Sequence, residues 1–547
     1  MSASITCTAL SFAWADGTTV FEDLDTAFGP GRTGLVGANG SGKSTLLKLL
    51  AGQLAPADGT VRVAGEIGHL PQNVTLDTGL RVDEALGIAA QRAALHAIEA
   101  GDVAEEHFET VGDDWDVEER ALATLGELGL GHVDLDRTIG EVSGGESVLL
   151  RLAALLLRRP DVLLLDEPTN NLDLYARRRL YAAVASWPGV MIVVSHDREL
   201  LDLVDQIADL RSGTITRYGG NFSAYEEALA VEQEAAERMV RVAEADLRRQ
   251  KRELSDAHAV LARRRRYGQK MYDTKREPRA VMKMRKRTAQ ESAGKYRIMH
   301  EEKLAEAKER LDDAVEAVRD DDEIRVDLPY TAVPPGRSVL TLRDLELAHG
   351  ARVAGGLDLH GPERIALTGR NGAGKTTLLR TIAGELEPVS GEATAHVPLR
   401  FLPQRLDVLD DGLTVAENVA RFSPGVTDNR IRARLARFLF RGARADRRAA
   451  TLSGGERFRA ALAALMLAEP APQLLMLDEP TNNLDMASVR QLTTALESYE
   501  GALIVASHDM AFLDSIGVTR RLLLEGGELK DVTGDTGPAT GARARTA

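Results

Sequence analysis

The sequence predicts an α/β protein in which two similar domains are joined by a long α-helical hairpin. The first observation is an internal repeat, because one ordered set of motifs occurs twice along the chain. GANGSGKST at 37–45 matches GRNGAGKTT at 369–377, and two apolar runs that continue into DEPTNNLD finish at Asp173 and Asp485. The second observation is a heptad spacing of apolar residues between the two copies, which is typical of paired helices.

The offsets between the repeated motifs locate the domain boundaries. The two glycine-rich loops are 332 residues apart, whereas VSGGE at 142–146 and LSGGE at 452–456 are 310 residues apart. This difference places about 22 additional residues in the first copy, between Gln72 and Ser143. We therefore expect a first domain at 1–220, a linker at 221–335, a second domain at 336–532 and a disordered tail at 533–547.

Composition excludes several classes of protein. The 547 residues are 44% hydrophobic and carry a net charge of −15, which is typical of a water-soluble chain with sizeable cores. The single cysteine, Cys7, excludes a disulfide framework, a structural zinc cluster and a protein-held iron–sulfur cluster. No apolar stretch approaches the roughly 20 residues that a membrane span needs. We expect a cytoplasmic protein that does not itself contact a membrane.

Each glycine-rich loop has the pattern GxxxxGK[ST] and lies between an apolar run typical of a strand and one typical of a helix. Glycine allows the backbone N–H groups to surround phosphates, and the helix N-terminus adds a favourable dipole. The lysines should contact the β- and γ-phosphates, and the following hydroxyls should bind Mg²⁺. The expected ATP-binding residues are Gly37, Asn39, Gly40, Gly42, Lys43, Ser44 and Thr45, with Gly369, Asn371, Gly372, Gly374, Lys375, Thr376 and Thr377.

Acidic residues and a histidine follow buried strands in both copies. The runs VLLLDE and LLMLDE end in two carboxylates, and VMIVVSHD and ALIVASHD end in a histidine and an aspartate. Parallel sheets place ligands at the carboxyl ends of their strands, so these side chains should lie near the phosphates. We expect Mg²⁺ ligands at Asp166 and Asp478, catalytic carboxylates at Glu167 and Glu479 that orient or deprotonate water, and γ-phosphate contacts at His196 and His508.

The order phosphate loop, glutamine, SGGE, DEPTNNLD, SHD resembles the ATP-binding cassette family over nearly both halves of the chain. The resemblance implies tandem cassette nucleotide-binding domains, ATP and Mg²⁺ as cofactors, and an intramolecular cassette dimer in a monomeric chain. It also implies that each SGGE caps the ATP bound by the opposite domain, and that the two glutamines bind Mg²⁺. One site would combine Lys43, Ser44, Gln72, Asp166, Glu167 and His196 with Ser453, Gly454, Gly455 and Glu456. The other would combine Lys375, Thr376, Gln404, Asp478, Glu479 and His508 with Ser143, Gly144, Gly145 and Glu146.

The two copies differ at the signature motif and at the adenine position. Val142 replaces the leucine that the family usually has in the first signature, and Ser147 stands where the second copy has Arg457. We expect slower hydrolysis at the site that Ser143 completes. The family commonly stacks an aromatic residue on adenine, where this chain has Trp14 in the first copy and His349 in the second.

The connector between the domains predicts two long antiparallel helices. No glycine or proline occurs between Gly220 and Gly268, and Val240, Leu247, Leu254 and Leu261 recur every seven residues. The same period returns further along at Leu304, Leu311 and Val318.

The stretch at 263–287 lies at the far end of this hairpin and contains twelve Lys or Arg against two acids, Asp273 and Glu277. A solvated loop would explain the charge alone, but about 40 helical residues would carry this tip some 60 Å from its base, and a solvated loop needs no such support. Arginine and lysine neutralise phosphates, while tyrosine stacks on bases. The expected RNA-binding residues are Arg263, Arg264, Arg265, Arg266, Tyr267, Lys270, Tyr272, Lys275, Arg276, Arg279, Lys283, Arg285, Lys286 and Arg287.

Two cassettes joined by a charged helical hairpin resemble the ABC-F ATPases, and YGGNFSAYE at 218–226 resembles that family's lead into the linker. The resemblance implies that the linker enters the ribosome, touches P-site tRNA and brings its tip near large-subunit rRNA at the peptidyl transferase centre. Three functions stay open: protection of ribosomes from large-subunit antibiotics, which the short first-domain insertion favours, a housekeeping factor for stalled ribosomes, and a transporter ATPase. A transporter has no reason to carry a basic hairpin.

Overall fold

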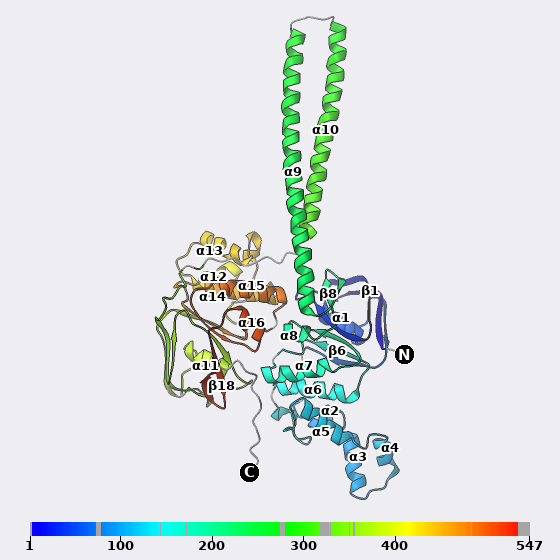
Figure 1. The fold of residues 1–547 in the computed structure, drawn as a ribbon, viewed down its shortest axis with the longest axis vertical. Coiled ribbons are helices and arrows are strands. Elements are labelled where there is room, and N and C mark those ends of the chain that lie inside the picture. The colour runs from blue at the N-terminus through cyan, green and yellow to red at the C-terminus, as the bar shows by residue number, and fades with distance from the viewer. Residues whose placement is uncertain are drawn as a thin grey trace. The chain divides into compact units, whose positions relative to one another are not determined.

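The computed structural model describes residues 3–72, 78–142, 144–170, 172–273, 279–317, 328, 330–348, 350–353, 356–482 and 484–533. The chain forms two compact units. One comprises Met1–Phe222 together with Asp322–Ala547 and holds both α/β domains, and the other comprises Ser223–Asp321. Figure 1 shows the elements of each unit.

The first domain contains a six-stranded sheet of order β5-β6-β7-β3-β8-β9 and a three-stranded antiparallel sheet of order β2-β1-β4. The central strands of the larger sheet are parallel and fully buried, because their sequences (VLLLD, VMIVV) are continuously apolar up to the strand end. The strands of the first domain are β1 (Ser4–Ala13), β2 (Thr19–Phe28), β3 (Gly31–Val36), β4 (Asp58–Ala64), β5 (Ile67–Leu70), β6 (Val162–Asp166), β7 (Val190–Val194), β8 (Gln206–Arg211) and β9 (Thr214–Gly219). Its helices are α1 (Lys43–Leu50), α2 (Val82–Leu86), α3 (Ala89–Glu99), α4 (Glu105–Val111), α5 (Val117–Glu127), η1 (Ile139–Glu141), α6 (Gly144–Arg158), α7 (Leu174–Ala185) and α8 (Arg198–Leu201).

The second domain repeats the parallel order as β15-β16-β17-β13-β18 within a ten-stranded sheet. Its strands are β10 (Ser338–Glu346), β11 (Arg352–Val353), β12 (Leu357–His360), β13 (Arg364–Thr368), β14 (Ser390–Ala395), β15 (Leu399–Leu402), β16 (Leu474–Asp478), β17 (Ala502–Ala506), β18 (Arg520–Glu525) and β19 (Glu528–Asp531). Its helices are α11 (Lys375–Ile382), α12 (Val415–Phe422), α13 (Asp428–Leu435), η2 (Ala436–Phe438), η3 (Gly442–Asp446), η4 (Ala449–Thr451), α14 (Gly454–Met466), α15 (Met486–Glu497) and α16 (Met510–Ser515). The equal strand order confirms the predicted pair of similar α/β domains.

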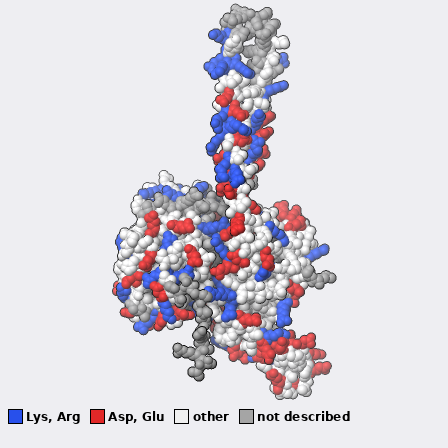
Figure 2. Space-filling view, in the orientation of Figure 1, with Lys and Arg blue, Asp and Glu red and all other residues white. Residues whose placement is uncertain are grey.

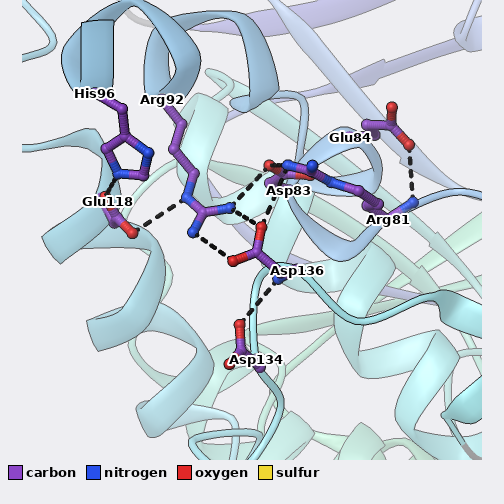
Figure 3. A network of polar contacts seen from close by, with 8 residues as sticks. All are labelled: Arg81, Asp83, Glu84, Arg92, His96, Glu118, Asp134 and Asp136. Atoms are coloured by element: carbon purple, nitrogen blue, oxygen red, sulfur yellow. Dashed lines mark hydrogen bonds and ion pairs between the residues drawn. The ribbon is translucent and has the colours of Figure 1, made fainter. Parts of the chain in front are cut away.

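The additional residues of the first domain form part of a small helical lobe, with acidic side chains over α3 and α4 (Figure 2). Arg92 on α3 holds this lobe in place (Figure 3). Its guanidinium donates to Asp83 on α2 at 3.1 Å, to Glu118 on α5 at 3.1 Å and to Asp136 at 2.6 and 3.0 Å. Because Asp136 precedes the VSGGE segment, the network connects the lobe to the chain that leads into α6.

The hairpin consists of α9 (Phe222–Asp273) and α10 (Arg279–Ala317), which run antiparallel and side by side (Figure 1). The predicted pair of long helices is therefore confirmed. Arg310 on α10 donates to Asp246 on α9 at 2.8 Å, which fixes the register between two positions 64 residues apart in sequence.

The seam between the two helices is only half apolar. The predicted leucines, such as Leu247 and Leu254, are partly buried. Among the seam positions whose burial the structure describes, the buried ones are also spaced by seven but are small or polar: Gln250, Ala257, His300 and Ala307. Polar residues at single seam positions specify register in coiled coils at a cost in stability. The seam of this hairpin thus specifies one register between α9 and α10, at a cost in the stability of their packing.

Candidate functional site

The first phosphate loop runs from the end of β3 to the start of α1. Gly42 caps α1 in the left-handed region, with φ of 103°, and Gly37 has φ of 152° with no room for a Cβ beside the Leu210 carbonyl. The Lys43 ammonium donates to the carbonyl oxygens of Gly37 at 2.8 Å and of Ala38 at 3.0 Å. Burial lowers the pKa of Lys43. The loop therefore holds a desolvated cation at the N-terminus of a helix, which suits a phosphate.

The second phosphate loop has the same geometry between β13 and α11. Gly374 caps the helix with φ of 102°, and Lys375 donates to the Gly369 carbonyl at 2.8 Å. Lys375 also lies 3.0 Å from Nε2 of His508, a contact between side chains that lie 133 residues apart in sequence. Both predicted loops thus adopt the strand–loop–helix conformation that a bound triphosphate requires.

A hydroxyl and a carboxylate meet beside each loop. Ser44 Oγ donates to Asp166 Oδ1 at 3.1 Å, and Thr376 hydrogen-bonds to Asp478. Burial raises the pKa of both aspartates, and within the described residues Asp478 Oδ2 is buried with no hydrogen-bond partner. A hydroxyl beside a buried, unsatisfied carboxylate oxygen is the donor set that Mg²⁺ accepts next to phosphates. The residues present therefore fit this ion.

A glutamate and a histidine pair at the end of each central strand. Nε2 of His196 lies 3.1 Å from Oε1 of Glu167, and Nε2 of His508 lies 3.4 Å from Oε1 of Glu479. Burial raises the pKa of Glu167 to about 8 and that of Glu479 to about 7. Burial also lowers the pKa of each histidine to about 3, so both imidazoles are neutral at pH 7.

Both glutamates have a strained backbone. Glu167 has φ of 48° and Glu479 has φ of 46°, in the left-handed region that side chains other than glycine rarely adopt. The N–H of each donates to the adjoining strand, to Val194 O and Ala506 O at 2.8 Å. Strain of this kind concentrates at functional sites and persists only where the surrounding structure enforces it. The paired sheet therefore holds each carboxylate at a defined point beyond the strand.

The sequence did not single out Asp173 and Asp485 as site residues. Each caps the helix after its DEPTNNLD segment and also reaches the phosphate loop of the other domain. Asp485 Oδ2 accepts from Asn39 N at 2.9 Å, and Asp173 Oδ2 accepts from Asn371 N at 3.4 Å. Both aspartates end the repeated DEPTNNLD motif, and this shared position is the sequence feature that could have identified them as site residues.

Comparisons with known proteins identify the family. The family model for the ABC transporter domain matches residues 21–170 and 356–482. The chain is 34% identical to the tylosin resistance ATP-binding protein TlrC of Streptomyces fradiae, over 90% of this chain and 92% of TlrC. It is 29% identical to ABC transporter F family member 5 of Arabidopsis thaliana, over 95% of this chain and 75% of that relative. The chain belongs to the ABC-F family of ATP-binding cassette ATPases.

A solved structure shows a similar fold. The archaeal ribosome recycling factor aABCE1, in complex with the stalk protein aP1, superposes with a TM-score of 0.52 at 20% identity, over 94% of this chain and 87% of that chain. As expected for this family, each domain is an ATP-binding cassette, and the chain hydrolyses ATP. None of the helices in the described part of the chain combines the length and apolar character that a membrane span requires.

The signature motifs begin the helices of the two cassettes. Ser453 caps α14, where its N–H donates to Glu456 at 2.9 Å and its Oγ accepts from Glu456 N at 3.3 Å. In the first cassette Gly144, Gly145 and Glu146 open α6, and Ser143 lies outside the described residues. That each signature caps the ATP of the opposite cassette remains a prediction.

The remaining predicted ATP contacts stay predictions, and the structure shows only where some of these side chains lie. Trp14 directly follows β1, is 43% exposed and forms a T-shaped contact with Phe12, with ring centroids 5.1 Å apart. Its stacking on adenine remains a prediction. Gln72 and Gln404 are exposed just after β5 and β15, and their contact with Mg²⁺ remains a prediction. His349 lies outside the described residues.

Part of the basic tip is described. Arg263 to Arg266 are exposed along α9, Tyr267 is 68% exposed, and Lys270 and Arg287 are exposed too. The expected side chains that lie outside the described residues are Tyr272, Lys275, Arg276, Arg279, Lys283, Arg285 and Lys286. Consecutive residues on a helix point in different directions, so the four arginines present charge around α9 rather than on one face.

Proposed function

We propose that this ATPase is cytosolic, binds the ribosome and places its hairpin tip near P-site tRNA and the peptidyl transferase centre. The observation that carries the proposal is the tip itself. A chain of net charge −15 concentrates twelve Lys or Arg at 263–287, at the end of a helical hairpin between two cassettes. Such a concentration suits RNA phosphates, and the acidic remainder disfavours indiscriminate RNA binding elsewhere.

In the proposed reaction the cassettes bind ATP with Mg²⁺. Ser44, Gln72 and Asp166 would hold the ion in one site, and Thr376, Gln404 and Asp478 in the other. The ion would neutralise charge that develops on the transferred phosphoryl group. Glu167 and Glu479 would accept a proton from the attacking water when they are deprotonated. Each neutral histidine has a single N–H, which would donate toward the γ-phosphate when ATP is bound. Release of ADP and phosphate would open the cassettes, and the chain would then dissociate from the ribosome.

The specific role that we favour is protection of ribosomes from large-subunit antibiotics. Support comes from the relative whose name records tylosin resistance and which matches this chain over nearly its full length. The tip adds exposed Tyr267 and Met284 to its charge, and these side chains offer shape and stacking at the point of deepest insertion.

The test of RNA binding replaces Arg263, Arg264, Arg265 and Arg266 with Ser and titrates ribosome binding against salt. We expect weaker binding, with the slope of log affinity against log salt reduced by roughly 0.7 to 0.9 for each lost phosphate contact, and unchanged basal ATP turnover. A matched control replaces four arginines of α9 that lie before the basic tip, Arg238, Arg241, Arg248 and Arg252, with Ser. Wild-type binding of the tip variant at every salt concentration would contradict the proposal.

The test of protection is survival of a host that expresses the chain in tylosin and in other large-subunit antibiotics. A variant with Ala at Tyr267, Met271, Tyr272, Met282 and Met284 retains the tip charge, so it should still bind ribosomes but fail to protect. If wild-type expression leaves susceptibility to every drug unchanged while relieving stalled ribosomes, the chain is a housekeeping factor and the protective role is wrong.

A further inference from the structure

A second basic segment lies in the second cassette, far from the hairpin tip in sequence. Residues 428–448 contain eight arginines against two acids, Asp428 and Asp446. Some of these arginines have structural partners: Arg432 pairs with Asp428 and Asp446, each at 2.6 Å, and Arg447 donates to Glu456 at 2.6 Å. Arg434 also has a partner, Glu469, whereas other arginines of the segment do not pair with an acid among the described residues.

Three of these arginines line a cavity of about 770 Å³. Arg430, Arg434 and Arg437 are spaced by four and three residues, so they share one face of α13 and its continuation η2. Ala433, on the same face, contributes only a methyl group and leaves the wall hollow. The sole acid in the described lining is Glu469, which pairs with Arg434 at 3.0 Å. Among the described residues, Arg430 and Arg437 form no side-chain hydrogen bond or ion pair.

The cavity is separate from the ATP sites. Pro398 and Gln473, which line it, directly precede β15 and β16, whereas the ATP motifs follow the carboxyl ends of the parallel strands. Met466 and Leu467, at the end of α14, give the cavity an apolar surface. Cationic side chains beside an apolar surface, at the opposite edge of the sheet from the nucleotide motifs, mark a distinct site.

An aromatic ring is held at the cavity by buried neighbours. Tyr330 is 74% exposed, although Leu328 and Thr331 beside it are 7% and 1% exposed. Thr331 fixes the turn, since its N–H and Oγ1 donate to the Leu328 carbonyl at 3.1 and 2.7 Å and its Oγ1 accepts from Glu500 N at 3.3 Å. The turn therefore holds the backbone of Tyr330 at the cavity and leaves its ring exposed to solvent, where a base can stack on it.

We propose that this cavity binds a phosphate-bearing nucleotide, with its phosphate on Arg430 and Arg437 and its base against Tyr330. Two unpaired guanidiniums provide the charge and donor geometry that a phosphate needs, and an exposed ring beside an apolar surface provides a platform for a base. Arg434, held by Glu469, lines the wall between the two phosphate-binding arginines. The nucleotide is either free or part of an RNA strand, and the experiment distinguishes the two.

The test measures binding of a fluorescein-labelled octauridylate to the full chain by anisotropy. The background has Ser at Arg263, Arg264, Arg265 and Arg266, which reduces the contribution of the hairpin tip to the signal. Arg430→Gln with Arg437→Gln should raise the Kd about tenfold and reduce the salt slope by roughly 1.4, which corresponds to two single-strand phosphate contacts. Tyr330→Ala should raise the Kd about tenfold with an unchanged salt slope, because one stacked base is lost and no charge is removed.

The matched control is Arg441→Gln with Arg444→Gln, because both residues are exposed in the same segment but do not line the cavity. The control pair should leave the Kd within about twofold, and ATP turnover should be unchanged in all variants. Displacement of the octauridylate by uridine monophosphate supports a site for a free nucleotide, and failure of the monophosphate to displace it supports an RNA strand. Equal effects of the two arginine pairs, or no effect of Tyr330→Ala, would overturn the proposal whether or not the tip binds ribosomes.

Discussion

The ATP site built on Lys43 and the ATP site built on Lys375 carry the same motifs but differ in their polar contacts. His196 lies closer to Glu167 than His508 does to Glu479, at 3.1 against 3.4 Å. Lys375 is 3.0 Å from His508. The pKa of Glu167 is about 8 and that of Glu479 about 7, with burial as the main cause in both.

A residue of the first cassette accounts for part of this inequality. After burial and Lys375, the positive charge of Arg177 also acts on Glu479 and lowers its pKa, whereas the equivalent position of the second cassette is Val489. Arg177 is buried and pairs with Asp197 at 3.2 Å. Identical motifs therefore do not ensure identical sites, because a charge outside the motifs acts on one catalytic carboxylate in addition to the burial that raises the pKa of both.

The largest expected effect removes both catalytic carboxylates. Glu167→Gln with Glu479→Gln retains size and hydrogen bonding but abolishes the base, so ATP turnover should fall by about 100-fold or more while ATP binding survives. Steady-state phosphate release and nucleotide affinity measure the two properties. Unchanged turnover in this variant would show that the glutamates are not the bases.

The second prediction separates the two sites by pH. Each glutamate is a base only when it is deprotonated, so activity rises as pH passes its pKa. Glu167→Gln leaves Glu479, with a midpoint near pH 7, and Glu479→Gln leaves Glu167, with a midpoint near pH 8. At pH 7 the Glu167→Gln variant should turn over ATP about fivefold faster than the Glu479→Gln variant, relative to their plateaus. If the two variants have the same pH profile, the predicted difference between the pKa values of Glu167 and Glu479 is wrong.

The third prediction concerns the contacts between cassettes. Asp485→Asn retains the helix cap but removes the charge that accepts from Asn39 N, so ATP turnover should fall about fivefold. Asp173→Asn is the matched control, because its contact to Asn371 N is longer, at 3.4 against 2.9 Å, and it should cost less. A larger loss from the Asp173 change would contradict the geometric ranking.

The smallest expected effect is at the adenine positions. Trp14→Ala should lose an aromatic stack of about 1 kcal/mol and weaken nucleotide affinity a few-fold at the Lys43 site. His349→Ala should lose less at the other site. Titration with a fluorescent ATP analogue measures both, and a stronger effect at His349 would refute the alignment of the second cassette.

The sequence predicted the cassettes well because their motifs depend on local geometry. A buried apolar strand, a glycine loop and a helix start are contiguous in sequence. The position of Lys43 at the start of a helix, and of Asp166 and Glu167 at the end of a strand, therefore follows from the sequence alone. The hairpin followed for the same reason, since heptad spacing is a local pattern.

Contacts between distant residues were not predictable in this way. The bond from Asn39 to Asp485 spans 446 positions, and the effect of Arg177 on Glu479 depends on how the cassettes pack. The buried seam residues Gln250 and His300 were also missed, because polar residues carry no apolar periodicity. Motifs reveal which groups are present, whereas tertiary packing decides their neighbours and their pKa.

The central claim is that ATP hydrolysis in the two cassettes controls how long the chain stays on the ribosome. The most direct measurement is sedimentation of the Glu167→Gln, Glu479→Gln variant with purified ribosomes, with and without ATP. The account predicts that ATP retains the variant in the ribosome pellet, while the wild-type chain dissociates as it turns ATP over. Equal recovery of the variant in the supernatant with and without ATP would contradict the claim.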